Sequence, residues 1–219
     1  MGTNPTELVL RRAGRSVHLM QLLPFWAIGR LVDAGLRRLL PGVLRSEPVE
    51  GTSEVVIERD EFVALAPKFV RHYAIHPVWP ESELRWILDL AAMRTRNGPL
   101  RLSKVVDAKG AVIGCYAYYG TRGSIAHVLN ILTFKNRENE VIKSLMAATE
   151  SAGCVAARGP LQLFQWEWLC RSPGMYIHRN SFAWAMSKHQ DAKDAISRND
   201  IYMGGLAGEA WSLLIGDLM

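Results

Sequence analysis

The clearest candidate for chemistry in this sequence is an anion-binding site at the start of a helix near residue 136. An apolar stretch, Ser124–Phe134, runs into the polar residues Lys135, Asn136 and Arg137, and a helical pattern then continues to Ala152. The first backbone amides of a helix have no partner inside it and lie at the positive end of its dipole, so they bind anions. Lys135 and Arg137 add positive charge, and Asn136 is the expected helix cap.

The stretch around this site reads as strand, turn, strand, helix, strand. The apolar and aromatic strands are Ala111–Tyr119, Ser124–Phe134 and Cys154–Ala157, and the second is apolar on both faces, as in the middle of a sheet. A strand that enters a helix and returns as a strand predicts a right-handed, parallel crossover. We therefore predict a mixed sheet containing a parallel pair formed by strands near Asn130 and Val155.

Hydrophobic periodicity places further elements on both sides of this stretch. The expected elements are a strand at 54–58, helices at 60–73 and 80–96, a strand at 100–106, a helix at 160–171, one or two strands at 175–187, a helix at 191–198 and a strand at 210–215. The strand at 100–106 should form a hairpin with the one that begins at residue 111.

Charge divides the chain into a leader, residues 1–45, and a domain, residues 46–219. The leader holds seven arginines against Glu7 and Asp33, whereas the domain has nineteen basic and nineteen acidic residues. A nucleic-acid-binding domain would gather basic residues on its folded part, so we expect no nucleic-acid partner. Within the leader, Ser16–Leu40 has amphipathic helical spacing, which predicts a linker helix packed on protein in preference to a basic helix on a membrane surface.

Several other kinds of chemistry are excluded. The three cysteines, Cys115, Cys154 and Cys170, lie far apart in apolar surroundings and have no metal-ligand spacing, so we expect buried free thiols and no metal site. There is also no Ser/His/Asp set and no supported pair of carboxylates. Free thiols, no evident signal peptide and no apolar stretch long enough for a bilayer predict a cytoplasmic protein.

The order of elements over residues 54–188 resembles the GCN5-related N-acetyltransferase (GNAT) superfamily. The resemblance rests on two helices after the first strand, the Asp-x-x-Gly hairpin within Val106–Gly114, and the long strand that enters a helix. The tail Asn199–Trp211 and the arginine-rich Ser16–Arg45 also look like the end and the linker of bacterial proteins that carry two such domains in tandem. The resemblance implies an α/β (α+β) fold, with a mixed β-sheet, helices on both faces and a central parallel strand pair.

The resemblance also implies acetyl-CoA or another acyl-CoA, bound where the two central parallel strands splay apart. Backbone groups of Ile131 and Leu132 would pair with the pantetheine arm, and Lys135, Asn136 and Arg137 would hold the pyrophosphate. The family's loop reads Q/R-x-x-G-x-G/A, because glycines let the backbone close on phosphate oxygens. The corresponding segment of this chain, residues 134–140, has no glycine and contains two carboxylates.

Acyl transfer to an amine needs a base for the amine and an acid for the leaving thiolate. His127, on the strand before the loop, matches the family's place for the base, and Tyr176, after the last helix, matches the place of the acid. A hydrogen-bonded core histidine and a half-buried strand tyrosine are the structural alternatives. His72 and His76 could face an acceptor pocket or bond carbonyls at a helix end.

Two functions remain open from the sequence. The first is an N-acyltransferase that moves an acetyl or longer acyl group from acyl-CoA to an amine of a small molecule or peptide. The second is a catalytically inactive, GNAT-like module that completes a cleft with a second GNAT-like domain or with another copy of itself. The loop without glycine favours the second function for this half taken alone.

Overall fold

A computed structural model describes residues 23–39, 49–160, 165–171 and 186–207. Its elements in chain order are α2 (Leu23–Leu39), β1 (Ser53–Val56), α4 (Arg59–Val70), α5 (Glu81–Met93), β2 (Leu100–Val106), β3 (Val112–Tyr119), β4 (Ile125–Thr133), α6 (Glu138–Ser151), β5 (Ala156–Arg158), α7 (Trp166–Arg171), α8 (Gln190–Ser197) and the 3-10 helix η3 (Gly205–Ala207). The strand predicted at 210–215 and nearly all of the one predicted at 175–187 lie outside the described residues.

The described strands form one mixed sheet in the order β1-β2-β3-β4-β5. The first four are antiparallel, whereas β4 and β5 are parallel, with Ile125 opposite Ala156 and His127 opposite Arg158. The predicted parallel pair is therefore confirmed, although it lies at residues 125–127, ahead of Asn130. The order and pairing of these elements are those that the GNAT resemblance implied.

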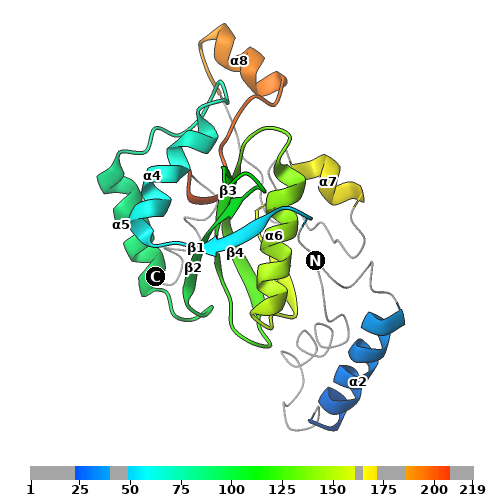
Figure 1. Ribbon diagram of the computed structural model, residues 1–219. Helices are drawn as coiled ribbons and strands as arrows, with labels where there is room; N and C mark the ends of the chain where they lie inside the picture. The colour runs from blue at the N-terminus through cyan, green and yellow to red at the C-terminus, as the bar shows by residue number, and fades with distance from the viewer. Residues whose placement is uncertain (1–22, 40–48, 161–164, 172–185, 208–219) are drawn as a thin grey trace.

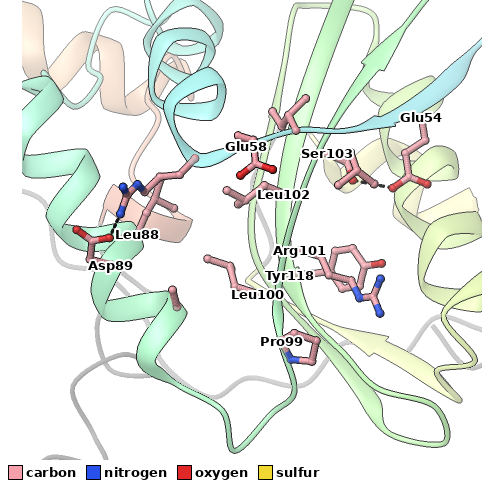
Figure 2. A pocket seen from close by; sticks show the side chains of 14 residues that line it. Glu54, Glu58, Leu88, Asp89, Pro99, Leu100, Arg101, Leu102, Ser103 and Tyr118 are labelled. Atoms are coloured by element: carbon pink, nitrogen blue, oxygen red, sulfur yellow. Dashed lines mark hydrogen bonds and ion pairs between the residues drawn. The ribbon is translucent and has the colours of Figure 1, made fainter.

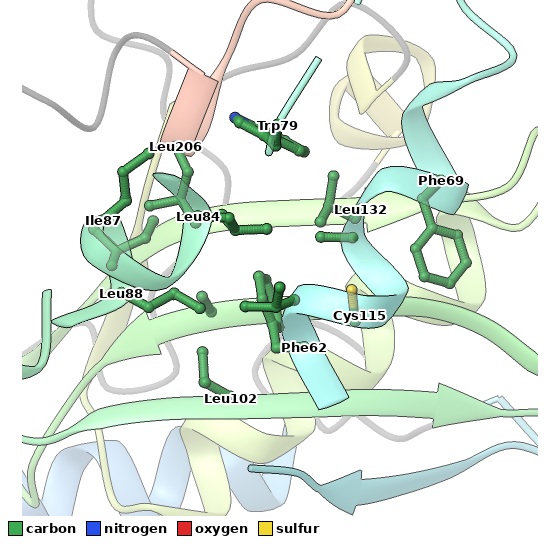
Figure 3. Close-up of a cluster of buried hydrophobic side chains, with 14 of the residues drawn as sticks. Phe62, Phe69, Trp79, Leu84, Ile87, Leu88, Leu102, Cys115, Leu132 and Leu206 are labelled. Atoms are coloured by element: carbon green, nitrogen blue, oxygen red, sulfur yellow. The ribbon is translucent and has the colours of Figure 1, made fainter. Parts of the chain in front are cut away.

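Helices cover both faces of the sheet, as the sequence predicted (Figure 1). α4 and α5 bury one face, whose core includes Phe62, Leu88 and Leu132 (Figure 3). α6 buries the opposite face, where Tyr116 and Leu145 belong to a second cluster. Burial on both faces explains why the central strands are apolar at consecutive positions.

A β-bulge in β4 changes the course of the central strand. Ala117 of β3 faces Asn130, but Tyr118 faces Val128, so Leu129 is an extra residue on β4. A bulge of this kind turns two consecutive side chains to one face. Leu129 packs in the core beneath α4 and α5, and Asn130 points to the same side, where Tyr202 contacts it. The bulge lies just beyond the last pair between β4 and β5, so it marks the point where the two strands separate.

Two predicted helix caps are wrong by one or two residues. The cap of α6 is Arg137, not Asn136, and it makes no side-chain capping bond. Asn136 instead adopts a left-handed conformation, with φ +66°, that turns the chain after β4 and delays the helix. Likewise α4, predicted from residue 60 with Asp60 suited to its cap, is capped by Glu58 and already includes Asp60.

The amphipathic segment Ser16–Leu40 does contain a helix, α2. Apolar side chains of this helix are exposed in the described part of the chain: Leu31 is 74% and Leu39 is 79% exposed. Packing of this stripe on protein and the boundary at residue 45 both stay predictions. No helix among the described residues has the length and hydropathy needed to cross a membrane. Of the three free cysteines, Cys170 is exposed rather than buried.

Candidate functional site

The candidate site is the edge of β4 that β5 leaves uncovered. The last parallel pair is at His127, and beyond it β4 continues without β5. The amide of Phe134 donates to the carbonyl of Ile113 in β3, at 3.2 Å. Because bonding directions alternate along a strand, the peptide groups of Ile131 and Thr133 face away from β3, toward the side that β5 has left. The edge ends at the turn into α6.

Carboxylates of the chain itself bind the two residues just ahead of α6. The amide of Asn136 donates to Oε1 of Glu138 at 3.2 Å. The guanidinium of Arg137 donates to Oε1 of Glu140 at 3.0 Å and lies 3.8 Å from Oδ2 of Asp107. A backbone donor and a cation that could hold an anion are therefore already satisfied by anionic side chains.

Asp107, which the sequence analysis missed as part of this site, belongs to the turn between β2 and β3. Its Oδ1 accepts hydrogen bonds from the amides of Lys109 and Ala111, both at 2.9 Å. The Ala111 amide, followed by the Lys109 amide and the Arg137 guanidinium, holds the pKa of this carboxyl below its usual range. An ionised Asp107 thus connects the hairpin turn to the start of α6.

The residues predicted to bind the cofactor differ in what they present. Ile131 has its backbone at the edge that β5 leaves, where its carbonyl already accepts from the Tyr202 hydroxyl at 3.3 Å, while its side chain packs toward the α6 cluster. Leu132 is fully buried under α4 and α5, and it pairs with Cys115 of β3. Lys135 is exposed in the turn before α6. Of the predicted cations, then, Arg137 is engaged by carboxylates and Lys135 faces solvent.

The predicted catalytic residues are not brought to this turn. His127 lies opposite Tyr119 on the antiparallel side, which places it on the face covered by α4 and α5. It precedes Lys135 by eight residues, a separation of about 26 Å in an extended strand. Tyr176, the predicted acid, lies outside the described residues.

Asn130 and Tyr202 meet at the bulge, and the sequence analysis missed both. The Tyr202 hydroxyl donates to Oδ1 of Asn130 and approaches the carbonyl of Ile131 at 3.3 Å. Asn130 is 2% exposed, and its Nδ2 has no hydrogen-bond partner among the described residues. A buried donor of this kind is unusual and costly. The signal in the sequence was an asparagine inside an otherwise apolar strand.

His72 lies near the turn between β4 and α6, in the loop after α4. Its ring stands 4.1 Å from that of Tyr73, and neither ring nitrogen has a hydrogen-bond partner in the described part of the chain. Burial, followed by the charge of Lys135, lowers the pKa of His72. His76 instead has Nδ1 2.7 Å from the carbonyl of Tyr73, as the helix-end alternative expected.

We predict that His72 titrates below the ordinary histidine pKa and that Lys135→Ala raises its midpoint. The reason is that removal of the lysine charge makes the imidazolium less unfavourable. Because the folded pKa is lowered, the contribution of His72 to stability is full above the unfolded pKa and declines as pH falls toward the folded one. NMR titration of the imidazole carbons measures both midpoints, with Lys193→Ala as the control. Equal midpoints in the wild type and Lys135→Ala would contradict the prediction.

Two other kinds of site receive no support from the described residues. Among them, no group of three or more His, Cys, Asp or Glu side chains is placed to hold a metal. A cavity of about 610 Å³ lies at the β1–β2 edge of the sheet, and Glu54, Asp89 and Arg101 are among its lining residues (Figure 2). Two of its carboxylates are engaged, Glu54 by the Ser103 hydroxyl at 2.7 Å and Asp89 by Arg59. This cavity contains none of the predicted site residues and lies at the opposite edge of the sheet from β5.

Comparison with known proteins found likenesses in structure alone. No protein-family model matches the chain, and no curated protein matches it. Glucosamine-6-phosphate N-acetyltransferase from Arabidopsis thaliana is 11% identical, with 61% of this chain and 99% of that one covered and a TM-score of 0.38. An aminoglycoside antibiotic 6'-N-acetyltransferase from Acinetobacter baumannii is 11% identical, with 64% and 100% covered and a TM-score of 0.40. Ribosomal-protein-alanine N-acetyltransferase from Brucella melitensis biovar Abortus 2308 is 11% identical, with 61% and 99% covered and a TM-score of 0.41.

Likenesses this distant say nothing about what this chain acts on. The site must therefore be judged from its own residues. An acyl-CoA would bring a pyrophosphate to the start of α6, where Glu138 already binds the Asn136 amide and Glu140 already binds the Arg137 guanidinium. The side chains at this end of the site do not fit that group, since two carboxylates would repel it.

Proposed function

We propose that this chain is a GNAT-like binding module that takes up no acyl-CoA by itself and completes a cleft with a partner domain. The observation that carries this proposal is the engagement of the Asn136 amide and the Arg137 guanidinium by Glu138, Glu140 and Asp107. A phosphate would have to displace these carboxylates and would then be repelled by them. The partner is a second GNAT-like domain or another copy of this chain.

An N-acyltransferase is the second candidate function. It would move an acetyl or longer acyl group from acyl-CoA to an amine of a small molecule or peptide. The edge of β4 that β5 leaves beyond the parallel pair favours it, and so does the buried Nδ2 of Asn130, which has no partner among the described residues, because a ligand carbonyl there would satisfy this donor. In this candidate, His127 and Tyr176 would be the base and the acid.

Calorimetric titration of the full chain with acetyl-CoA distinguishes the two functions. We expect no binding heat up to about 1 mM, because the Asn136 amide and the Arg137 guanidinium are already engaged and the added anion meets two carboxylates. Adenosine triphosphate serves as a control for nonspecific binding of phosphates to the basic chain. A dissociation constant below about 0.1 mM for acetyl-CoA, with no comparable binding of the control, would favour the acyltransferase.

A further inference from the structure

We propose that the segment Asp200–Leu206 is a built-in occupant of the free edge of β4 and closes the half of the opening next to the bulge. This is where the acyl-pantetheine arm of a cofactor would lie, so the inference rests on the GNAT-like arrangement of the proposed function. It concerns the opposite end of the site from the carboxylates at α6. The opening is thus closed by different residues at its two ends.

The segment is fixed to the loop that follows α4. Ile201 forms a parallel bridge with Ile75, in which the Tyr202 amide donates to the Ile75 carbonyl at 2.8 Å. The Ile75 amide donates to the carbonyl of Asp200 at 3.2 Å, and the Ala74 amide donates to its side chain, also at 3.2 Å. Four residues of tail and loop are therefore joined by three hydrogen bonds that involve the backbone.

Apolar contacts hold the same segment in the core. The Tyr202 ring is 2% exposed and has its centroid 5.6 Å from that of Tyr73 and 6.4 Å from that of Trp79. Leu206 is fully buried in the cluster beneath α4 and α5, where Figure 3 shows it beside Leu84 and Ile87. Burial of these side chains removes apolar surface from water and so stabilises the docked position of the segment.

From this position the segment contacts the β4 edge directly. The Tyr202 hydroxyl bonds Asn130 and lies 3.3 Å from the Ile131 carbonyl, which faces away from β3. Gly205 approaches so closely that a Cβ on it would lie 2.7 Å from the Leu129 carbonyl. Its φ of +63° also favours glycine. The backbone of the segment therefore lies so close to β4 at position 205 that only glycine fits there without displacement.

The segment Asp200–Leu206 covers β4 from the point at which the residues just after β5 no longer contact it. At Gly159, just after β5, a Cβ would lie 2.8 Å from the Val128 side chain, so that part of the chain still abuts β4. The next residues of β4, Leu129 to Ile131, are met by Gly205 and Tyr202. An extended ligand could not lie along this part of the edge unless the segment moved away.

A probe with no phosphate tests this closure separately from the carboxylates at α6. S-acetylpantetheine is such a probe, and its binding to the full chain can be measured by ligand-observed NMR. Gly205→Ala should push the segment off β4, whereas Gly110→Ala is a matched control: its φ is also positive, at +79°, but a Cβ there meets nothing within 4 Å. We expect Gly205→Ala to bind the probe at least tenfold more tightly than the wild type and Gly110→Ala. Equal affinity in all three, or binding by none, would overturn the proposal.

Hydrogen exchange provides a second measurement that needs no ligand. The Tyr202 amide should be protected in the wild type and in Gly110→Ala and should exchange at least tenfold faster in Gly205→Ala. Exchange of this amide in the wild type at the rate of an exposed amide would also overturn the proposal. If Gly205→Ala does not fold, Tyr202→Phe removes only the hydroxyl contacts, with Tyr118→Phe as its control. Tyr202→Phe should then bind S-acetylpantetheine more tightly than the wild type, and equal affinity would count against the proposal.

The two proposals can fail separately. Wild-type protein that binds acetyl-CoA but not S-acetylpantetheine would contradict the proposed function and leave the closure by Asp200–Leu206 in place. Wild-type protein that binds S-acetylpantetheine as tightly as Gly205→Ala would contradict the closure, whatever acetyl-CoA does.

Discussion

Replacement of both Glu138 and Glu140 by glutamine is expected to give the chain an affinity for the nucleotide end of coenzyme A. The double variant removes two negative charges from the start of α6 and releases the Arg137 guanidinium from Glu140. Removal of each carboxylate charge near a helix N-terminus is worth about 1 kcal/mol. The two removals together should therefore raise the affinity for the phosphate ligand about thirtyfold. Adenosine 3',5'-bisphosphate, which lacks the pantetheine arm, is the probe, and calorimetry is the measurement.

The control for this experiment is Glu150→Gln, which removes a carboxylate from the last turn of the same helix. It should leave affinity unchanged, because the effect of a charge on the helix dipole falls off within one turn. The gain in the double variant should also shrink as salt is added, since part of it is electrostatic. Equal affinities for the wild type and the double variant would mean that the two glutamates do not keep phosphate away.

Gly114→Ala is expected to lower the free energy of unfolding by about 1–3 kcal/mol, because it places a methyl group in a filled space. Gly114 lies on β3 where α6 crosses it, and a Cβ there would be 2.5 Å from Val141 and 2.6 Å from the carbonyl of Leu132. α6 would have to move away from the sheet to admit it. Urea unfolding followed by circular dichroism measures the change.

Gly35→Ala is the control for that substitution, since a Cβ at Gly35 meets nothing within 4 Å. Alanine also favours a helix over glycine, so Gly35→Ala should not lower the midpoint. An unchanged midpoint in Gly114→Ala would show that α6 does not pack on β3 as closely as the structure indicates.

Local pattern was enough to predict the central crossover of this fold. Apolar strands and a helix of the right length required only neighbours in sequence, and so did the end of the helix, where Gly153 has the positive φ, +76°, that suits glycine there. The bulge could not be predicted, because the extra residue, Leu129, is apolar like its neighbour Val128 and therefore leaves the hydrophobic pattern unchanged. The left-handed turn at Asn136 was missed for a similar reason, because asparagine suits both a helix cap and that conformation.

The site itself depends on contacts between distant parts of the chain. Asp107 contacts Arg137 from the turn between β2 and β3, and Tyr202 contacts Asn130, which is 72 positions away in the sequence. Neither contact can be inferred from the spacing of residues that are close together in the sequence. The sequence could thus show that the loop lacks glycine, but it could not show which groups already occupy its donors.

The insertion of Tyr202 and Leu206 into the core has a consequence for the order in which the protein folds. The cluster under α4 and α5 contains residues that are synthesised early, including Tyr73 and Trp79. Tyr202 and Leu206, which complete this cluster, are synthesised more than a hundred residues later. Contacts of such long sequence separation form late and slow folding, because the intervening chain must first be ordered. A chain whose synthesis stopped before residue 200 would leave these aromatic rings open to water, and exposed apolar surface of this kind is what chaperones and proteases act on. Docking of Asp200–Leu206 is therefore expected to be a late folding step, after which these rings are covered.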